Sequence, residues 1–94
     1  MVKLRSADLL IRNGVEGDPW AEPLVRGSHN PKLLPGAAGY VDASRGISVL
    51  GVPVGPVDRS QGDVHPAGNP HFTLDPATAS VVTANILEGL ARVA

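Results

Sequence analysis

Three histidines are the side chains best suited to chemistry in this sequence, because imidazole is the commonest protein ligand for metal ions. They are His29, His65 and His71. His65 and His71 lie in one glycine- and proline-rich stretch that leads into a predicted helix. A zinc site needs three or four ligands, however, and a His-x5-His pair in a loop is more often two solvated side chains. The spacing alone leaves both interpretations open, and His29, which follows a predicted helix end, is assigned no role.

The carboxylates and hydroxyls of the chain indicate no catalytic centre. Asp75 precedes Pro76, and this pair is typical of a helix start, with Asp as the N-cap and Pro in the first helical position. Asp63 could orient a metal-binding imidazole, or it could be a solvated loop carboxylate. Ser44 and Ser60 lie in no GxSxG context, so the sequence predicts no nucleophile and no enzyme.

Short elements must position these residues. An apolar run that stops at a turn pair predicts a buried parallel strand within residues 8–12, and a second strand is expected near 40–43. Two Asp-Pro pairs predict helices over about 18–27 and 76–93. The predicted fold class is therefore α/β, with a small parallel sheet and flanking helices.

Apolar side chains are expected to define one face of each predicted helix. In the first helix Trp20, Leu24 and Val25 share a face, with Trp20 as a core or interface anchor. In the second, apolar residues recur at intervals of three and four, which predicts a buried stripe of Ala79, Val82, Ile86, Leu90 and Val93. Residues 51–70 are rich in proline and glycine, which predicts a long and mobile loop, and loops of this length are usually functional or disordered.

Composition excludes several classes of protein. The 94 residues suffice for one small domain, and the absence of cysteine rules out disulfides and thiolate metal sites. The net charge is −1 and the only aromatic residues are Trp20, Tyr40 and Phe72. A nucleic-acid partner is not expected, because such proteins show clustered basic or stacking aromatic side chains. The chain shows neither a transmembrane run nor a signal-peptide pattern.

One motif carries a resemblance. Residues 68–76 (GNPHFTLDP) resemble the Asp/Asn-Pro-His-x-Trp-Leu-Asp-Pro signature of the zinc/manganese ABC-transporter solute-binding proteins. Residues 7–14 (ADLLIRNG), followed by Trp20, are similar to the upstream strand-and-helix pattern of that family, and residues 62–66 (GDVHP) resemble a subgroup. Thr73 departs from the signature, since many members have Trp there.

The resemblance implies a fold and a metal ligand. Family members have two α/β lobes joined by one long helix, with the metal between the lobes. Residues 1–94 would be one partial domain, a fragment of the N-terminal lobe, with 51–70 as the loop near the metal and 76–94 as the start of the interlobe helix. His71 matches a histidine ligand of the motif, and His65 would be an auxiliary capture group. The remaining ligands are expected outside this chain.

The resemblance also implies a function. The parent protein would capture a divalent metal ion in the periplasm or another extracytoplasmic space, with zinc favoured and manganese as the alternative. It would deliver the ion to an ABC permease in the membrane, and a metallochaperone is a further expected partner. Two other hypotheses stay open. One is a stand-alone structural or interaction domain with incidental histidines, and the other is a metallohydrolase fragment, although no HExxH motif supports it.

Overall fold

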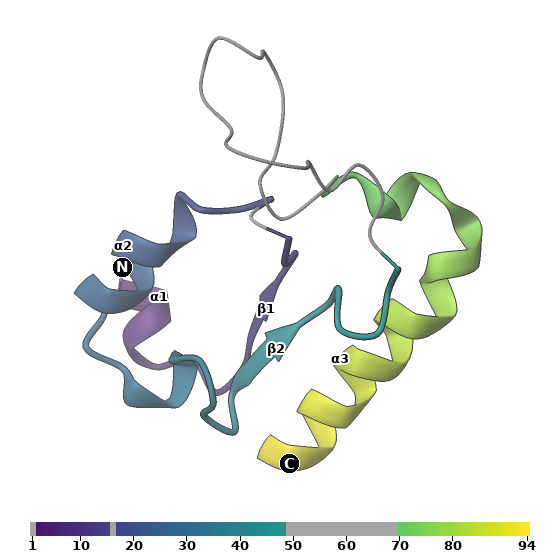
Figure 1. Ribbon diagram of the computed structural model, residues 1–94. Helices are drawn as coiled ribbons and strands as arrows, with labels where there is room; N and C mark the ends of the chain where they lie inside the picture. The colour runs from purple at the N-terminus through teal and green to yellow at the C-terminus, as the bar shows by residue number, and fades with distance from the viewer. Residues whose placement is uncertain (1, 16, 49–69) are drawn as a thin grey trace, which may run out of the picture.

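The computed structural model describes residues 2–15, 17–48 and 70–94 (Figure 1). Along the chain the elements are α1 (Val2–Arg5), β1 (Leu10–Arg12), α2 (Ala21–Gly27), the 3-10 turn η1 (Pro31–Leu33), β2 (Tyr40–Asp42), the 3-10 turns η3 (Phe72–Leu74) and η4 (Pro76–Thr78), and α3 (Ala79–Val93). The predicted α/β class, with a small parallel sheet and flanking helices, is confirmed. None of the helices in the described ranges is long and apolar enough to span a bilayer.

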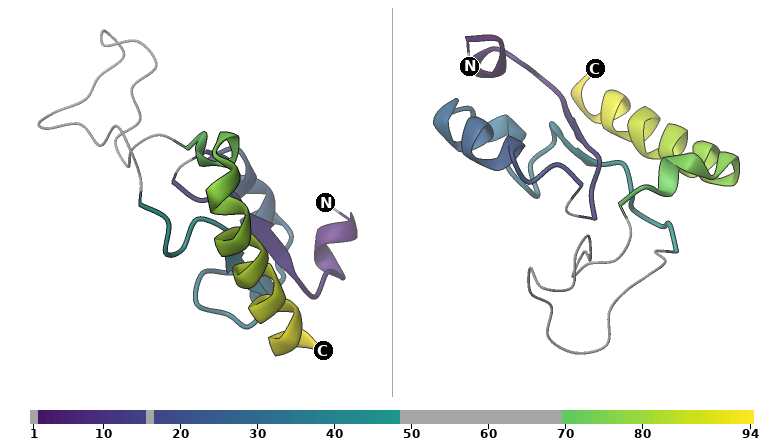
Figure 2. Two further views of the ribbon diagram at one scale, coloured as in Figure 1. Left: turned by 90° about the vertical axis from the view of Figure 1, so that its right-hand side faces the viewer. Right: turned by 90° about the horizontal axis from the view of Figure 1, so that it is seen from above.

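The two strands pair in parallel, and their register aligns Leu10 with Tyr40, Ile11 with Val41 and Arg12 with Asp42. Parallel strands need a crossover connection, which α2 and η1 supply here. Helices α1 and α2 lie on one side of the strands and α3 lies on the other, as Figures 1 and 2 show. The β1–α2 connection and the segment before α3 lie at the same end of the strands, where Asn13 contacts Pro70.

The buried apolar core of the described residues is small. It contains Ala21, Val25, Leu33, Val41, Ala43 and Phe72. Helix α3 lies close to β2 at Gly89, where an added Cβ would collide with the Val41 side chain. The prediction of a fully buried strand within 8–12 is wrong for Ile11, whose side chain is 45% exposed. The reason is that α3 packs over β2 and covers Val41, and does not extend over the register partner of Val41 on β1.

The predicted apolar faces of the helices are only partly correct. Val25 is buried, but Trp20 is 69% exposed and Leu24 is also exposed, so Trp20 is no core anchor. Helix α2 begins at Ala21, one residue after Trp20, and turns the Ala21–Val25 pair inward. In α3 the predicted stripe members Val82, Ile86 and Val93 are half-buried, whereas Ala79 and Leu90 are exposed. The buried position of that helix is Gly89.

Short turns flank β2 on both sides. Asn30 begins η1, and its side-chain oxygen accepts a hydrogen bond from the Lys32 backbone amide at 3.2 Å. A turn over residues 43–46 follows β2 directly. The proposed metal-proximal loop over 51–70, together with Asp63 and His65, lies outside the described residues except for Pro70.

Candidate metal-binding segment

His71 lies at the junction between Pro70 and the turn η3, with an exposed side chain. It occupies the N-cap position of η3, and its carbonyl accepts a hydrogen bond from the Leu74 backbone amide at 3.2 Å. The backbone of this residue is therefore fixed while its imidazole reaches the surface. This is the arrangement that an accessible metal ligand requires.

The segment is anchored downstream of His71 by Phe72. The Phe72 ring is buried, and its carbonyl accepts hydrogen bonds from the Asp75 backbone amide at 3.1 Å and the Thr78 hydroxyl at 3.0 Å. The Asp75 carboxylate in turn accepts from the Ala77 amide at 3.0 Å, which confirms the predicted N-cap next to Pro76. A buried ring and a capped turn together hold the chain on this side of His71.

The segment is anchored upstream of His71 by Pro70, which is buried. The side-chain amide of Asn13 donates hydrogen bonds to the Pro70 carbonyl at 3.2 Å and to the Gly14 carbonyl at 3.0 Å. Gly17 lies against this contact and must lack a side chain, because a Cβ there would lie 3.0 Å from the Pro70 ring and would collide with the Asn13 amide. The β1–α2 connection is thus in direct contact with the residue that precedes His71.

A buried cation holds that connection in place. Arg12 donates to the Asp18 carboxylate and to the Asp18 carbonyl, both at 2.9 Å, and to the Glu22 carboxylate at 3.2 Å. The same Asp18 oxygen also accepts from the Asn13 backbone amide at 3.0 Å. Burial lowers the pKa of Arg12, but the hydrogen bonds that its guanidinium donates to Asp18 and Glu22 outweigh this effect, so the pKa is raised overall. The guanidinium stays charged, and each of its three nitrogens donates a hydrogen bond.

The prediction that Asp18 caps α2 is wrong. No side chain caps that helix, because the Asp18 carboxylate is committed to Arg12 and Asn13. A charge-assisted hydrogen bond to a buried guanidinium is stronger than one to a helix-end amide that water can reach. Sequence reasoning missed this network, although a charged Arg12 at the end of an apolar strand was a signal that acidic partners must be near.

A cavity of about 310 Å³ lies beside His71. Its other lining residues are Ile47, Ser48, Phe72, Leu74, Asp75 and Thr78. Among the described residues that line it, His71 and Asp75 are the imidazole and carboxylate groups that could bind a metal, and the Asp75 carboxylate already caps a turn. Within the described parts of the chain, no three His, Asp, Glu or Cys residues form a group able to hold a metal ion. His71 is thus one ligand of a site that these parts do not complete.

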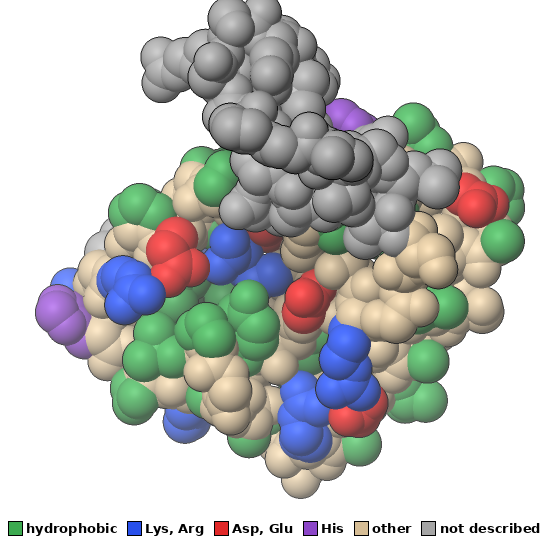
Figure 3. All heavy atoms as spheres, in the orientation of Figure 1, with side chains coloured by type: hydrophobic (Ala, Val, Ile, Leu, Met, Phe, Trp, Pro, Cys, Tyr) green, Lys and Arg blue, Asp and Glu red, His purple; other side chains and the backbone are tan. Residues whose placement is uncertain are grey.

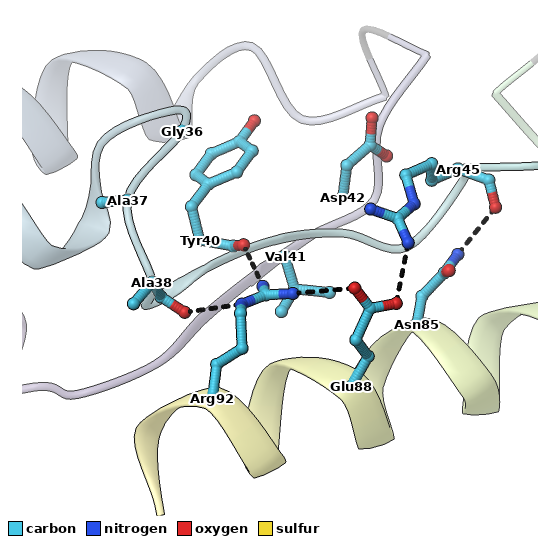
Figure 4. A pocket seen from close by; sticks show the side chains of 10 residues that line it. All are labelled: Gly36, Ala37, Ala38, Tyr40, Val41, Asp42, Arg45, Asn85, Glu88 and Arg92. Atoms are coloured by element: carbon cyan, nitrogen blue, oxygen red, sulfur yellow. Dashed lines mark hydrogen bonds and ion pairs between the residues drawn. The ribbon is translucent and has the colours of Figure 1, made fainter.

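A second cavity, of about 410 Å³, lies between β2 and α3 and is drawn in Figure 4. Three of its charged groups pair with one another: Glu88 pairs with Arg45 at 2.7 Å and with Arg92 at 3.3 Å. Arg92 also donates to the carbonyls of Ala38 at 3.2 Å and Tyr40 at 2.9 Å. These contacts fasten α3 to the outer edge of β2, so this cavity is better explained as a structural clamp than as a ligand site.

The remaining candidates of the sequence have structural roles in the described residues. His29 is exposed at the end of α2 with a φ of 55°, which confirms it as a surface residue. Ser44 is buried, and its hydroxyl donates to the Asp42 carboxylate at 2.6 Å, so it stabilises a turn. On the face shown in Figure 3, acidic and basic side chains are interspersed and form no extended basic patch.

Comparison with known proteins yields one family. The family model described as zinc-uptake complex component A, periplasmic, matches residues 1–94, which is the whole chain. No curated protein and no solved structure matches it.

Proposed function

Because the chain belongs to the family of periplasmic zinc-uptake components, a family of non-enzymatic metal-binding proteins of ABC transport, we propose that His71 is a direct ligand of the transported ion. The observation that carries this proposal is the fixed backbone of His71 between two anchors. Pro70 is held by Asn13 on one side, and Phe72 is buried on the other. The imidazole between them is exposed and cannot drift far.

Zinc is the proposed ion, with manganese as the alternative. The proposed ligand is an imidazole nitrogen, which suits zinc, whereas manganese prefers carboxylate and carbonyl oxygens. In the same proposal the intact protein works in the periplasm and delivers the ion to an ABC permease. His65, which lies outside the described residues, is proposed as an auxiliary group that helps to capture the ion.

The test is a zinc competition titration of the intact protein against a chromophoric chelator. His71→Ala is expected to weaken zinc binding by at least about 100-fold, because even outer partners of ligands are worth 10- to 100-fold. The matched control is His29→Ala, which removes an exposed histidine at the end of α2 and should leave the affinity unchanged. Wild-type affinity in His71→Ala would remove His71 from the site and favour a structural domain with incidental histidines.

A further inference from the structure

Asn13 connects two segments that lie far apart in the sequence. Its side-chain amide donates to the Pro70 carbonyl at 3.2 Å, and the two residues are 57 positions apart. This hydrogen bond links the β1–α2 connection to the segment that carries His71. The peptide unit that accepts it joins Pro70 directly to His71, so the bond acts on the backbone of the proposed ligand itself.

Asn13 is itself held rigidly. Its backbone amide donates to the Asp18 carboxylate at 3.0 Å, and the same oxygen accepts from the buried Arg12 guanidinium at 2.9 Å. Its side-chain amide spends its second donor on Gly14, which has a φ of 81°. Both amide protons and the backbone amide are therefore engaged, and the missing side chain of Gly17 leaves the space that the Asn13 carboxamide occupies.

We propose that Asn13 is a positioning residue for the metal ligand His71, acting through its hydrogen bond to the Pro70 carbonyl. This inference rests on the proposed function of His71. A metal site tolerates errors of only about 0.5 Å and 10–20° in ligand placement. The Pro70 ring has no backbone N–H, so the carbonyl is the polar backbone group through which this residue can be fixed. Arg12 and Asp18 act one step further out, by holding Asn13.

Two substitutions separate the donor from the volume of the side chain. Asn13→Ala removes the carboxamide, whereas Asn13→Asp keeps its size but replaces the amide donor with an oxygen that repels the Pro70 carbonyl. Added negative charge near a bound cation would by itself tighten binding. Weaker binding by the aspartate variant therefore reports the loss of the donor.

Asn85→Ala is the matched control. The Asn85 side-chain amide also donates to two backbone carbonyls, those of Ala43 at 2.9 Å and Arg45 at 2.8 Å. Neither acceptor adjoins the segment that carries His71. Its loss should lower the thermal unfolding midpoint about as much as Asn13→Ala, without changing the metal site.

The experiment uses the intact protein and measures zinc affinity by chelator competition, the visible spectrum of the cobalt-substituted protein, and the thermal midpoint without metal. Both Asn13 variants are expected to bind zinc about tenfold more weakly, the lower end for a residue that supports a ligand. The cobalt absorption bands should shift in intensity or position in the Asn13 variants and stay unchanged in Asn85→Ala. The spectrum matters because a purely structural role would lower the midpoint and leave the cobalt bands alone.

Two results would overturn the inference. One is wild-type zinc affinity and cobalt spectrum in either Asn13 variant, and the other is an equal loss of affinity in Asn85→Ala. His71→Ala separates this failure from that of the proposed function. If His71→Ala loses zinc while the Asn13 variants keep it, only the positioning role fails. If His71→Ala keeps zinc, the ligand assignment fails, and the positioning role fails with it.

Discussion

Asp18 and Asp75 show how one dipeptide takes two roles at the level of single residues. Each is followed by proline, which is the pattern of a helix start. Asp75 caps its turn through the Ala77 amide, whereas the carboxylate of Asp18 binds Arg12 and the Asn13 amide. The difference comes from the neighbouring strand, since only Asp18 has a buried guanidinium within reach. A local pattern identifies a carboxylate that can cap, but the tertiary surroundings decide whether it does.

The Arg12–Asp18 pair should contribute to stability more than any exposed pair. The two side chains are only 10% and 16% exposed. Asp18→Ala is expected to lower the free energy of unfolding by about 3 kcal/mol, the lower end for breaking a buried pair, because Glu22 still contacts Arg12. Asp8→Ala is the control. Its pair with Lys32 joins side chains that are both mostly exposed, so its urea midpoint should hardly move. Equal midpoints for the two variants would contradict the assigned role of Arg12.

Tyr40 should make the fold sensitive to alkali. Burial raises the pKa of Tyr40, Arg12 opposes this effect and Asp42 adds to it, so the pKa is raised overall. A raised pKa in the folded state gives stability that is present below the unfolded value of about 10 and is lost as pH rises through the folded value. Urea unfolding at about pH 8 and about pH 10.5 should show a larger loss for the wild type than for Tyr40→Phe. Parallel losses would show that Tyr40 does not contribute.

At the level of elements, the apolar pattern predicts that α3 exists but not which residue centres its packing. The helix was expected to bury Leu90, yet Leu90 is 49% exposed and Gly89 is buried against Val41. A glycine adds nothing to an apolar stripe, although its missing side chain is what lets helix and strand approach closely. The exposure of Trp20 has a related cause. Helix α2 begins at Ala21 and not at the predicted residue 18, and a sequence pattern does not locate a helix start to within so few residues.

Gly89→Ala tests this contact. The new methyl group would collide with Val41 and lie 3.2 Å from the Leu9 side chain. Overpacking of this kind costs about 1–3 kcal/mol, and the gain in helix propensity offsets about 1 kcal/mol of it. We therefore expect a net loss of up to about 2 kcal/mol in the free energy of unfolding.

Two comparisons sharpen the test of Gly89. Ser80→Ala, at an exposed position of the same helix, should be neutral or slightly stabilising. Combined with Val41→Ala, Gly89→Ala should cost less than it does alone, because the clashing methyl groups are gone. Additive effects of the two substitutions would place the contact elsewhere.

Some features of the candidate site can be predicted from the sequence and others cannot. The motif at 68–76 predicts His71 and the Asp75 cap, because these features depend on neighbours in the sequence. It does not predict that Asn13 holds Pro70, because that bond joins residues 57 positions apart and depends on how the segment before α3 lies against the β1–α2 connection. A single sequence thus predicts the ligand and the cap, whereas the contact that fixes their position depends on the fold.

For the molecule as a whole, the described residues join a small core to much exposed apolar surface. Leu74 is 83% exposed, Leu87 65% and Ile11 45%, in addition to Trp20. A domain with few buried apolar side chains is marginally stable. These side chains gain stability only if further protein covers them, which fits the expectation that residues 1–94 form part of a larger lobe.

Residues 1–94 alone should therefore bind zinc poorly. The described residues bring no three metal-binding side chains together, and the cavity beside His71 adds only Asp75, which is engaged as a cap. A closed zinc site has about four ligands, and structural zinc sites with that number reach a binding free energy of about 10–16 kcal/mol. We expect the 94-residue chain to bind zinc at least roughly 1,000-fold more weakly than the intact protein in the same chelator competition.

His71→Ala should change the weak binding of the short chain little and the binding of the intact protein strongly. Tight one-to-one binding by residues 1–94 would contradict this, and would place the other ligands within this chain, with His65 and Asp63 as the first to substitute.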